Sequence, residues 1–185
     1  MDTCQLSQPC GAARGAALDA RLLRATMGHF ATGVTVITYT ADGLPAGMTA
    51  NAFMSVSLEP PLVLVSVRAA SRFHQHVREG VCYGVNFLAE DQRHLSGHFG
   101  GRPLDGAAPP FIHRGETPLL EGSLVHLVAR TVDVHPAGDH LLYIAQVEDI
   151  RFGSPRGPLL FYGGRYHHMP TRLPAIAHPD AADCC

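Results

Sequence analysis

A run of small and polar residues, 47–61 (GMTANAFMSVSLEPP), contains the first side chains in this chain that could hold a ligand. Its residues 49–52 (TANA) leave few bulky side chains on either face, so a planar ligand could approach the backbone and bond its N–H and C=O groups. The Asn51 amide both donates and accepts, which suits a ring edge with carbonyls and ring nitrogens. A solvent-facing strand with its polar residues on the wet side explains the pattern equally well.

A second candidate, residues 66–73 (SVRAASRF), follows an apolar run and opens a predicted helix. Ser71 suits the N-cap of that helix, because its hydroxyl can accept a hydrogen bond from a backbone N–H of the first turn. With the free N–H groups of that turn, Arg68 or Arg72 would make a natural phosphate site. The alternative is an ordinary capped helix with solvated arginines, and without further context it is the more common arrangement.

The histidines offer one candidate and no metal site. His140 lies in a Gly-Asp-His sequence between two predicted strands, where it could contact a substrate or transfer or stabilise charge near pH 7. Most histidines in turns are only surface groups. His94 and His98 share the face of a predicted helix, but neither an H-E-x-x-H motif nor a third ligand accompanies them, so we predict no metal.

Composition excludes several other classes of protein. The chain has 185 residues, of which 46% are apolar and 16% charged, and this predicts one folded domain rather than disorder. A net charge of −2 gives no general reason to bind nucleic acid or an anionic membrane. All 14 basic residues are Arg, which excludes a P-loop lysine and a Schiff-base lysine. Five scattered cysteines without zinc-ligand spacing favour a reducing cytoplasm.

Hydrophobic periodicity predicts a chain of short strands with helices between some of them. We expect helices over residues 18–30, 72–79 and 90–99, and a loop over residues 100–118. The expected strands are 34–40, 47–58, 62–67, 82–88, 123–135, 141–152 and 158–162. Asp42-Gly43 signals a hairpin between the first two strands, and residues 136–140 connect two later ones.

This order of elements indicates a mainly β fold with short helices, in which a mostly antiparallel barrel is decorated by helices. Regular β-α-β alternation and the G-x-G-x-x-G motif are both missing, which argues against a Rossmann domain even for a protein that uses a nicotinamide nucleotide. Residues 1–17 and 169–185 are expected to be flexible tails, and residues 18–168 the single domain.

Taken together, these segments resemble the flavin reductase-like family, the small reductase components of two-component flavin monooxygenases. The match runs in order from about Leu23 to Tyr166, and its order makes it specific. The segments that carry it are 27–38 (MGHFATGVTVIT), 47–53 (GMTANAF), 55–57 (SVS), 60–64 (PPLVL), 85–88 (VNFL), 138–140 (GDH) and 158–166 (PLLFYGGRY).

The resemblance implies a split β-barrel of Greek-key type, a homodimer, and a flavin bound near the subunit interface. It implies hydride transfer from NADH or NADPH to FMN or FAD, after which the reduced flavin leaves for a separate monooxygenase. No adenine-specific motif favours FAD over FMN. The usual residue test that separates NADH from NADPH applies to a Rossmann fold. The choice between FMN and FAD and the choice between NADH and NADPH therefore both stay open.

The resemblance also implies roles for individual residues. Residues 49–52 would hold the flavin ring edge, Ser66, Arg68 and Ser71 would face its phosphate, and His140 would line the nicotinamide side as the catalytic candidate. The full set of expected cofactor-binding residues is Met48, Thr49, Ala50, Asn51, Ala52, Ser55, Ser66, Val67, Arg68, Ser71, Phe73 and Tyr166. Many relatives have Ser at Ala52 and Thr at Phe73, so only backbone contacts are expected at these two positions.

Two other functions are compatible with the same residues. A related split-barrel oxidase would keep a tightly held FMN and act directly on a small substrate. A flavin-binding or carrier protein would bind flavin without turnover. A reductase that uses flavin as a substrate differs from both, because its rate saturates with added flavin.

Overall fold

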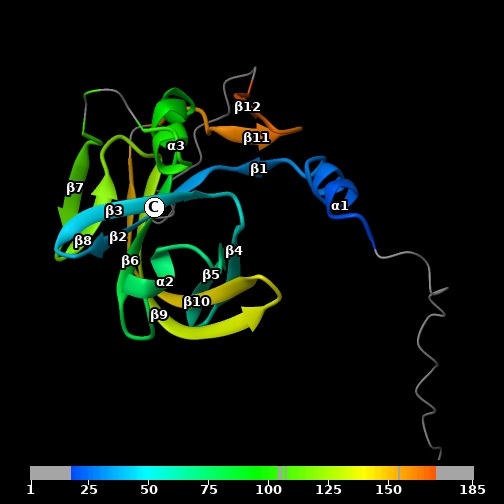
Figure 1. The fold of residues 1–185 in the computed structure, drawn as a ribbon. Helices are drawn as coiled ribbons and strands as arrows, with labels where there is room; N and C mark the ends of the chain where they lie inside the picture. The colour runs from blue at the N-terminus through cyan, green and yellow to red at the C-terminus, as the bar shows by residue number, and fades with distance from the viewer. Residues whose placement is uncertain (1–17, 104–105, 107, 154, 170–185) are drawn as a thin grey trace, which may run out of the picture.

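The computed structural model describes residues 18–103, 106, 108–153 and 155–169, which form a mainly β structure with short helices, as predicted (Figure 1). Seven strands make the main sheet, and every neighbouring pair in it is antiparallel. In sheet order they are β3 (Leu44–Ala50), β2 (Thr35–Ala41), β6 (Cys82–Phe87), β9 (Val125–Ala137), β10 (His140–Phe152), β5 (Pro61–Arg68) and β4 (Phe53–Leu58).

Two small antiparallel sheets complete the strands. The first contains β1 (Thr32–Gly33), β11 (Leu160–Tyr162) and β12 (Arg165–His167), and the second β7 (Phe111–Arg114) and β8 (Thr117–Leu120). The expected tail over residues 1–17 lies outside the described residues, as does all but Met169 of the expected tail over residues 169–185.

The hairpin expected at Asp42-Gly43 is confirmed and joins β2 to β3. Both residues have a positive φ, 51° and 79°. A two-residue turn with this geometry follows the natural twist of its strands, and Asp and Gly tolerate the left-handed conformation. The β-branched residues of β2 place this hairpin against the core, since Thr35 to Tyr39 are all buried.

The prediction of one strand over residues 47–58 is wrong. The segment contains two strands, β3 and β4, which are separated by Asn51 and Ala52 and lie at opposite edges of the seven-stranded sheet. β3 pairs with β2, whereas β4 turns back to pair with β5. The sheet must therefore curl, because its two edge strands are joined by only two residues.

Two other loops were predicted incorrectly. Within residues 100–118, where glycine and proline are frequent, β7 and the first half of β8 form a hairpin around Gly115, whose φ is +56°. The connection expected over residues 136–140 is shorter, since the two long strands continue to Ala137 and from His140, and only Gly138 and Asp139 form the turn. In both places cross-strand pairing outweighs local composition.

Two of the three expected helices are shorter in the structure, whereas residues 90–99 are helical throughout, beginning with a 3₁₀ turn. The helices are α1 (Ala20–Met27), α2 (Phe73–His76) and α3 (Arg93–Phe99), the last preceded by a 3₁₀ turn over Glu90–Gln92. The helix expected over residues 72–79 ends at His76, because Val77 is already extended and its side chain is buried in the core. None of the helices among the described residues is both long enough and apolar enough to span a membrane.

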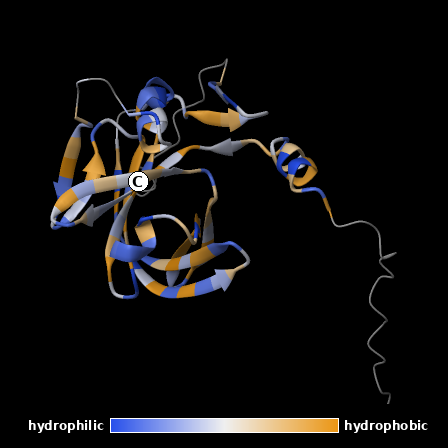
Figure 2. Ribbon diagram, in the orientation of Figure 1, coloured by the Kyte–Doolittle hydropathy of each residue, from blue (hydrophilic) through white to orange (hydrophobic). Residues whose placement is uncertain are grey.

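Two hydrophobic clusters form the interior. The larger lies inside the curled sheet and contains the aromatic side chains of Tyr39, Phe73, Tyr83 and Tyr143. The smaller, beneath α3 and β11, includes Val34, Val36, Leu88, Leu95, Leu120 and Leu159. α1 joins neither cluster: none of its residues is buried, and it projects away from the strands with an apolar stripe uncovered (Figures 1 and 2).

Candidate functional site

The break between β3 and β4 places the candidate ring-edge residues at the surface. Ala50 is buried, and its carbonyl oxygen accepts a hydrogen bond of 2.7 Å from the Thr35 hydroxyl. Asn51 and Ala52 are exposed immediately after it. A polar amide and open backbone therefore follow a firmly anchored strand end, an arrangement that leaves room for a planar ligand at the backbone.

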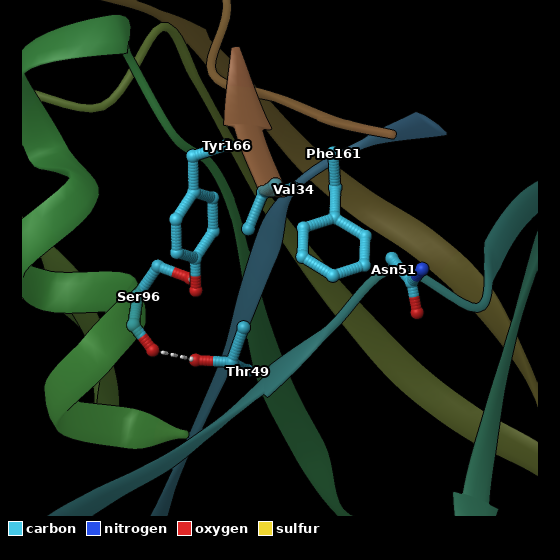
Figure 3. A pocket seen from close by; sticks show the side chains of 6 residues that line it. All are labelled: Val34, Thr49, Asn51, Ser96, Phe161 and Tyr166. Carbon is cyan, nitrogen blue, oxygen red and sulfur yellow. Dashed lines mark hydrogen bonds between the residues drawn. The ribbon is translucent and has the colours of Figure 1, made fainter. Parts of the chain in front are cut away.

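Two hollows meet at this break and share Val34 and Asn51 in their walls. The smaller, of about 130 Å³, is lined by Val34, Thr49, Asn51, Ser96, Phe161 and Tyr166 (Figure 3). The larger, of about 460 Å³, is mainly apolar, with Phe30, Phe53, Met54, Ser55 and Phe87 among its lining residues. Only the larger hollow reaches the usual size of a cofactor site, so the smaller has room for a ring edge or substituent.

Ser96 and Tyr166 form the polar wall of the small cavity. The Ser96 hydroxyl and the Tyr166 hydroxyl lie 2.8 Å apart and share a hydrogen bond. The Thr49 hydroxyl donates to the Ser96 carbonyl oxygen at 2.7 Å, and the Arg93 guanidinium lies 5.3 Å from the centre of the Tyr166 ring. Tyr166 was expected at the site, whereas Ser96, Val34 and Phe161 were missed because nothing in their local sequence distinguishes them from ordinary core positions.

The candidate phosphate segment runs directly beside the ring-edge segment. The Ser66 backbone N–H donates to the Ala52 carbonyl oxygen at 2.9 Å, and the Ser71 hydroxyl lies 3.7 Å from the Met48 sulfur. Ser71 also accepts from the Phe73 backbone N–H at 3.3 Å, although Arg72 rather than Ser71 occupies the N-cap of α2. Since α2 has only four residues, the expected contribution of free helix N–H groups to an anion site is not supported.

Three expected contact residues, Ala50, Val67 and Phe73, have side chains that belong to the core. Val67 is 2% exposed and Phe73 is 0% exposed, at the centre of the aromatic cluster. Their side chains are thus committed to packing, and only their backbone groups remain for a ligand. Ser55, by contrast, is exposed on β4 and lines the larger hollow.

His140 is the first residue of β10 and pairs in register with Arg68 of β5. Its Nδ1 lies 2.8 Å from a carboxylate oxygen of Asp139, and its side chain is 35% exposed. The hydrogen bond from His140, together with the charge of a protonated ring, lowers the pKa of Asp139. The carboxylate therefore stays ionised across the neutral range and can hold the ring in one orientation.

The structure places the ring-edge, phosphate and nicotinamide candidates next to one another along β5. Ser66 lies against Ala52, and Arg68, two residues or roughly 7 Å further along β5, lies opposite His140. Tyr166 approaches from the other side of Asn51, across the small cavity. Within the residues that the structure describes, no three histidine, cysteine or acidic side chains are grouped so that they could hold a metal ion.

Comparison with known proteins identifies the class. The sequence model of the flavin reductase-like domain matches residues 27–170. An NADH-dependent flavin reductase from a Rhodococcus species is 43% identical over 150 residues, which cover 80% of this chain and 85% of that protein. HsaB, the reductase subunit of a flavin-dependent monooxygenase from Rhodococcus jostii RHA1, is 39% identical over 84% of this chain and 81% of its own length.

A solved structure agrees with the sequence matches. The flavin reductase PheA2 in its native state superposes with a TM-score of 0.76 and 42% identity, covering 83% of this chain and 100% of that one. These matches define the class as flavin reductases, which are oxidoreductases. The chain belongs to the flavin reductase-like family.

Proposed function

We propose that this protein oxidises NADH, uses the hydride to reduce a flavin that binds as a substrate, and releases the reduced flavin to a separate monooxygenase. The observation that carries the proposal is the line of residues from Asn51 through Ser66 to Arg68 and His140, held together by backbone pairing within a flavin reductase-like chain. Relatives named as NADH-dependent flavin reductase and as monooxygenase reductase subunits support the same reaction.

The residues at the β3–β4 break fit the edge of a flavin ring. The Asn51 side chain makes no hydrogen bond to any other described residue, and it lines both hollows, so its amide is available to the carbonyls and ring nitrogens of a ligand. The exposed Ala52 adds backbone without bulk. We assign the ring edge to Met48, residues 49–52 and Ser55, with Tyr166 across the small cavity.

Ser66, Arg68 and Ser71 are assigned to the flavin phosphate. Arg68 is exposed at the end of β5, and no ion pair occupies its guanidinium among the described residues. A guanidinium of this kind, next to a hydroxyl, can bind a phosphate bidentately. Val67 and Phe73 contribute backbone groups at most, because their side chains are in the core.

His140 is assigned to the nicotinamide. When both nucleotides are bound, the nicotinamide and the flavin carry the hydride between them, and the protein supplies stacking, approach distance and exclusion of oxygen. A proton can come from solvent, so His140 needs only to orient the donor. Asp139 holds the ring in place for this role.

We also infer a homodimer built through the uncovered apolar surface. The large apolar residues of α1 and of the segments just before and after it are all exposed: Leu18, Leu22, Leu23, Met27 and Phe30. Met54, Val56 and Leu58 of the edge strand β4 and Ile150 and Phe152 of β10 are exposed as well. Exposed apolar surface of this extent is typical of a protein–protein interface. Phe30 and Met54 also line the larger hollow, so the proposed interface adjoins that hollow.

We also propose a split barrel of Greek-key type and a single domain over residues 18–168, as the family resemblance implies. The scattered cysteines support a cytoplasmic location. The short link between the two edge strands favours the barrel, since it forces the sheet to curl.

The test is to mix the purified protein with NADH in air and follow the loss of NADH absorbance as FMN, and separately FAD, is added. A rate that saturates with added flavin supports the proposal and ranks the two flavins. A flavin that stays bound through gel filtration would instead indicate the oxidase. Binding of flavin with no NADH or NADPH consumption above the protein-free control would indicate a carrier.

A further inference from the structure

Ser96 is a buried residue of α3 that connects two walls of the small cavity. Ser96 is 0% exposed, so it is an interior residue and not a surface serine. Its carbonyl oxygen accepts from the Thr49 hydroxyl on β3, and its own hydroxyl bonds the Tyr166 hydroxyl on β12 (Figure 3). Two strands that are distant in the sequence are therefore joined through a single helical residue.

The packing of α3 fixes where Ser96 lies. Gly47 allows the helix to approach β3 closely, because a Cβ at this position would lie 2.9 Å from the Phe99 ring. Leu95 is buried in the smaller core on the same helix. The Ser96 carbonyl oxygen, near the end of α3, also accepts from the Gly100 backbone N–H, so its second acceptor site is what the Thr49 hydroxyl uses.

The two hydrogen bonds bear directly on Asn51. Thr49 precedes Asn51 by two residues, so anchoring the Thr49 side chain anchors the strand end from which Asn51 projects. Tyr166 faces Asn51 across the cavity, and its ring is also held by the guanidinium of Arg93. Ser96 therefore bonds both the strand that carries Asn51 and the tyrosine that shares the cavity with it.

We propose that Ser96 is a positioning residue for flavin binding, which sets the width of the cavity between Asn51 and Tyr166 through its hydrogen bonds to Thr49 and Tyr166. The inference rests on the proposed function, because it assumes that the flavin ring edge binds at Asn51. Ser96 touches no reacting atom. Its effect is on affinity, since a wall held in place before binding loses less conformational entropy when the ligand arrives.

The test compares Ser96→Ala and Tyr166→Phe, which remove the same hydrogen bond from opposite partners. Both variants should fold, because Ala favours a helix and Phe keeps the ring beneath Arg93. The dissociation constant for FMN and for FAD is measured without NADH, from the change in flavin fluorescence. Each variant should weaken binding by about three- to tenfold, the usual value of one hydrogen bond.

The double variant distinguishes a shared bond from two separate contacts. If both residues act through the same hydrogen bond, Ser96→Ala with Tyr166→Phe should bind flavin no more weakly than the worse single variant. The kcat at saturating flavin and NADH should change less than about twofold, with the loss in KM for flavin. Losses that multiply in the double variant would overturn the proposal.

A matched control separates positioning from general loss of a buried hydroxyl. Thr131→Val removes a hydroxyl that is buried on β9 and has no hydrogen-bond partner, and it should leave the flavin dissociation constant unchanged. An unchanged constant in Ser96→Ala, or an equal loss in the control, would refute the role of Ser96 while wild-type turnover still supported the reductase. A wild-type protein that binds no flavin would overturn both proposals.

Discussion

At the residue scale, the site depends on three short segments that supply different chemistry. Asn51 offers an amide, Arg68 a guanidinium and His140 an imidazole. The pairing of β4, β5 and β10 places these groups near one another on one surface. Because each residue is assigned to a different part of a ligand, substituting each one should change the KM for a different substrate.

Arg68→Ala should weaken the binding of those flavins that carry a phosphate, and of no others. If Arg68 binds the phosphate as proposed, the KM for FMN should rise about tenfold, whereas the KM for riboflavin, which has no phosphate, should stay within about twofold of wild type. Arg114→Ala is the control, because this exposed arginine pairs with Asp149 on another part of the surface. Equal losses with FMN and riboflavin would contradict the assignment to phosphate.

His140→Ala should raise the KM for NADH by about tenfold and change kcat by less than about threefold, because we assign the histidine to orienting the nicotinamide and not to an obligatory proton transfer. Steady-state rates at saturating flavin measure this. His135→Ala is the matched control, since His135 lies 2.8 Å from Asp133 in a similar exposed pair. A collapse of kcat at unchanged KM would make His140 a proton donor.

Lowering the pH tests the pair that holds His140. The pKa of Asp139 is lowered in the folded protein, so its hydrogen bond is fully present above the ordinary carboxyl pKa and is lost as the pH falls through the lowered value. Asp139→Asn should therefore raise the KM for NADH at neutral pH by about two- to fivefold. The wild type and the variant should converge in acid, and a constant ratio of their KM values would contradict the pair.

At the element scale, the site is built by close approaches that bulky residues would prevent. Gly47 brings α3 onto β3, and Gly84 brings the β7–β8 hairpin onto β6. Asn86 completes the second junction: its amide nitrogen donates to the Val36 carbonyl and its amide oxygen accepts from the Leu120 backbone N–H. These contacts connect the main sheet with the smaller core beneath the cavity.

Gly84→Ala should destabilise the fold, because its Cβ would lie 2.7 Å from the Pro118 carbonyl oxygen and still closer to the Thr38 hydroxyl. Overpacking of this kind costs about 1–3 kcal/mol, measurable as a lower Tm or a lower midpoint in urea. Gly97→Ala in α3 meets open space and should raise stability by about 0.5–1 kcal/mol. Equal stability of the two variants would contradict the packing of β8 on β6.

At the scale of the whole molecule, the described chain leaves an apolar helix without a partner. Leu22 of α1 is 58% exposed, and Asp19 caps this helix by accepting from the Arg21 backbone N–H. The helix is therefore formed locally, while its apolar face is covered by nothing in the described part of the chain (Figure 2). A second copy of the chain is the partner that we propose.

Leu22→Glu should convert a dimer into a monomer, because it places a charge in the proposed interface. Light scattering should give twice the chain mass of 19.8 kDa for wild type and a single chain mass for the variant. Leu44→Glu is the control, since Leu44 is 70% exposed beside the turn between β2 and β3 and should leave the dimer intact. A monomeric wild type would refute the interface.

Several elements could be predicted because their signals are local. Asp42-Gly43 encodes a two-residue turn, the β-branched run of β2 encodes a strand, and the spacing of leucines in α1 encodes an amphipathic helix. The break at Asn51 was missed, since nothing local marks where a chain leaves one sheet edge for the other. The hairpin of β7 and β8 was missed because its stability comes from packing on β6.

The sequence by itself determined the family, the mainly β class and the candidate residues of the ring edge, phosphate and nicotinamide, because residue types and their order along the chain carry that information. Only the tertiary structure decided that Ser96 and Phe161 belong to the cavity wall and that Phe73 does not present its side chain to a ligand. Whether a side chain faces a cavity or the core depends on contacts between elements that are far apart in the sequence, and no local pattern encodes them.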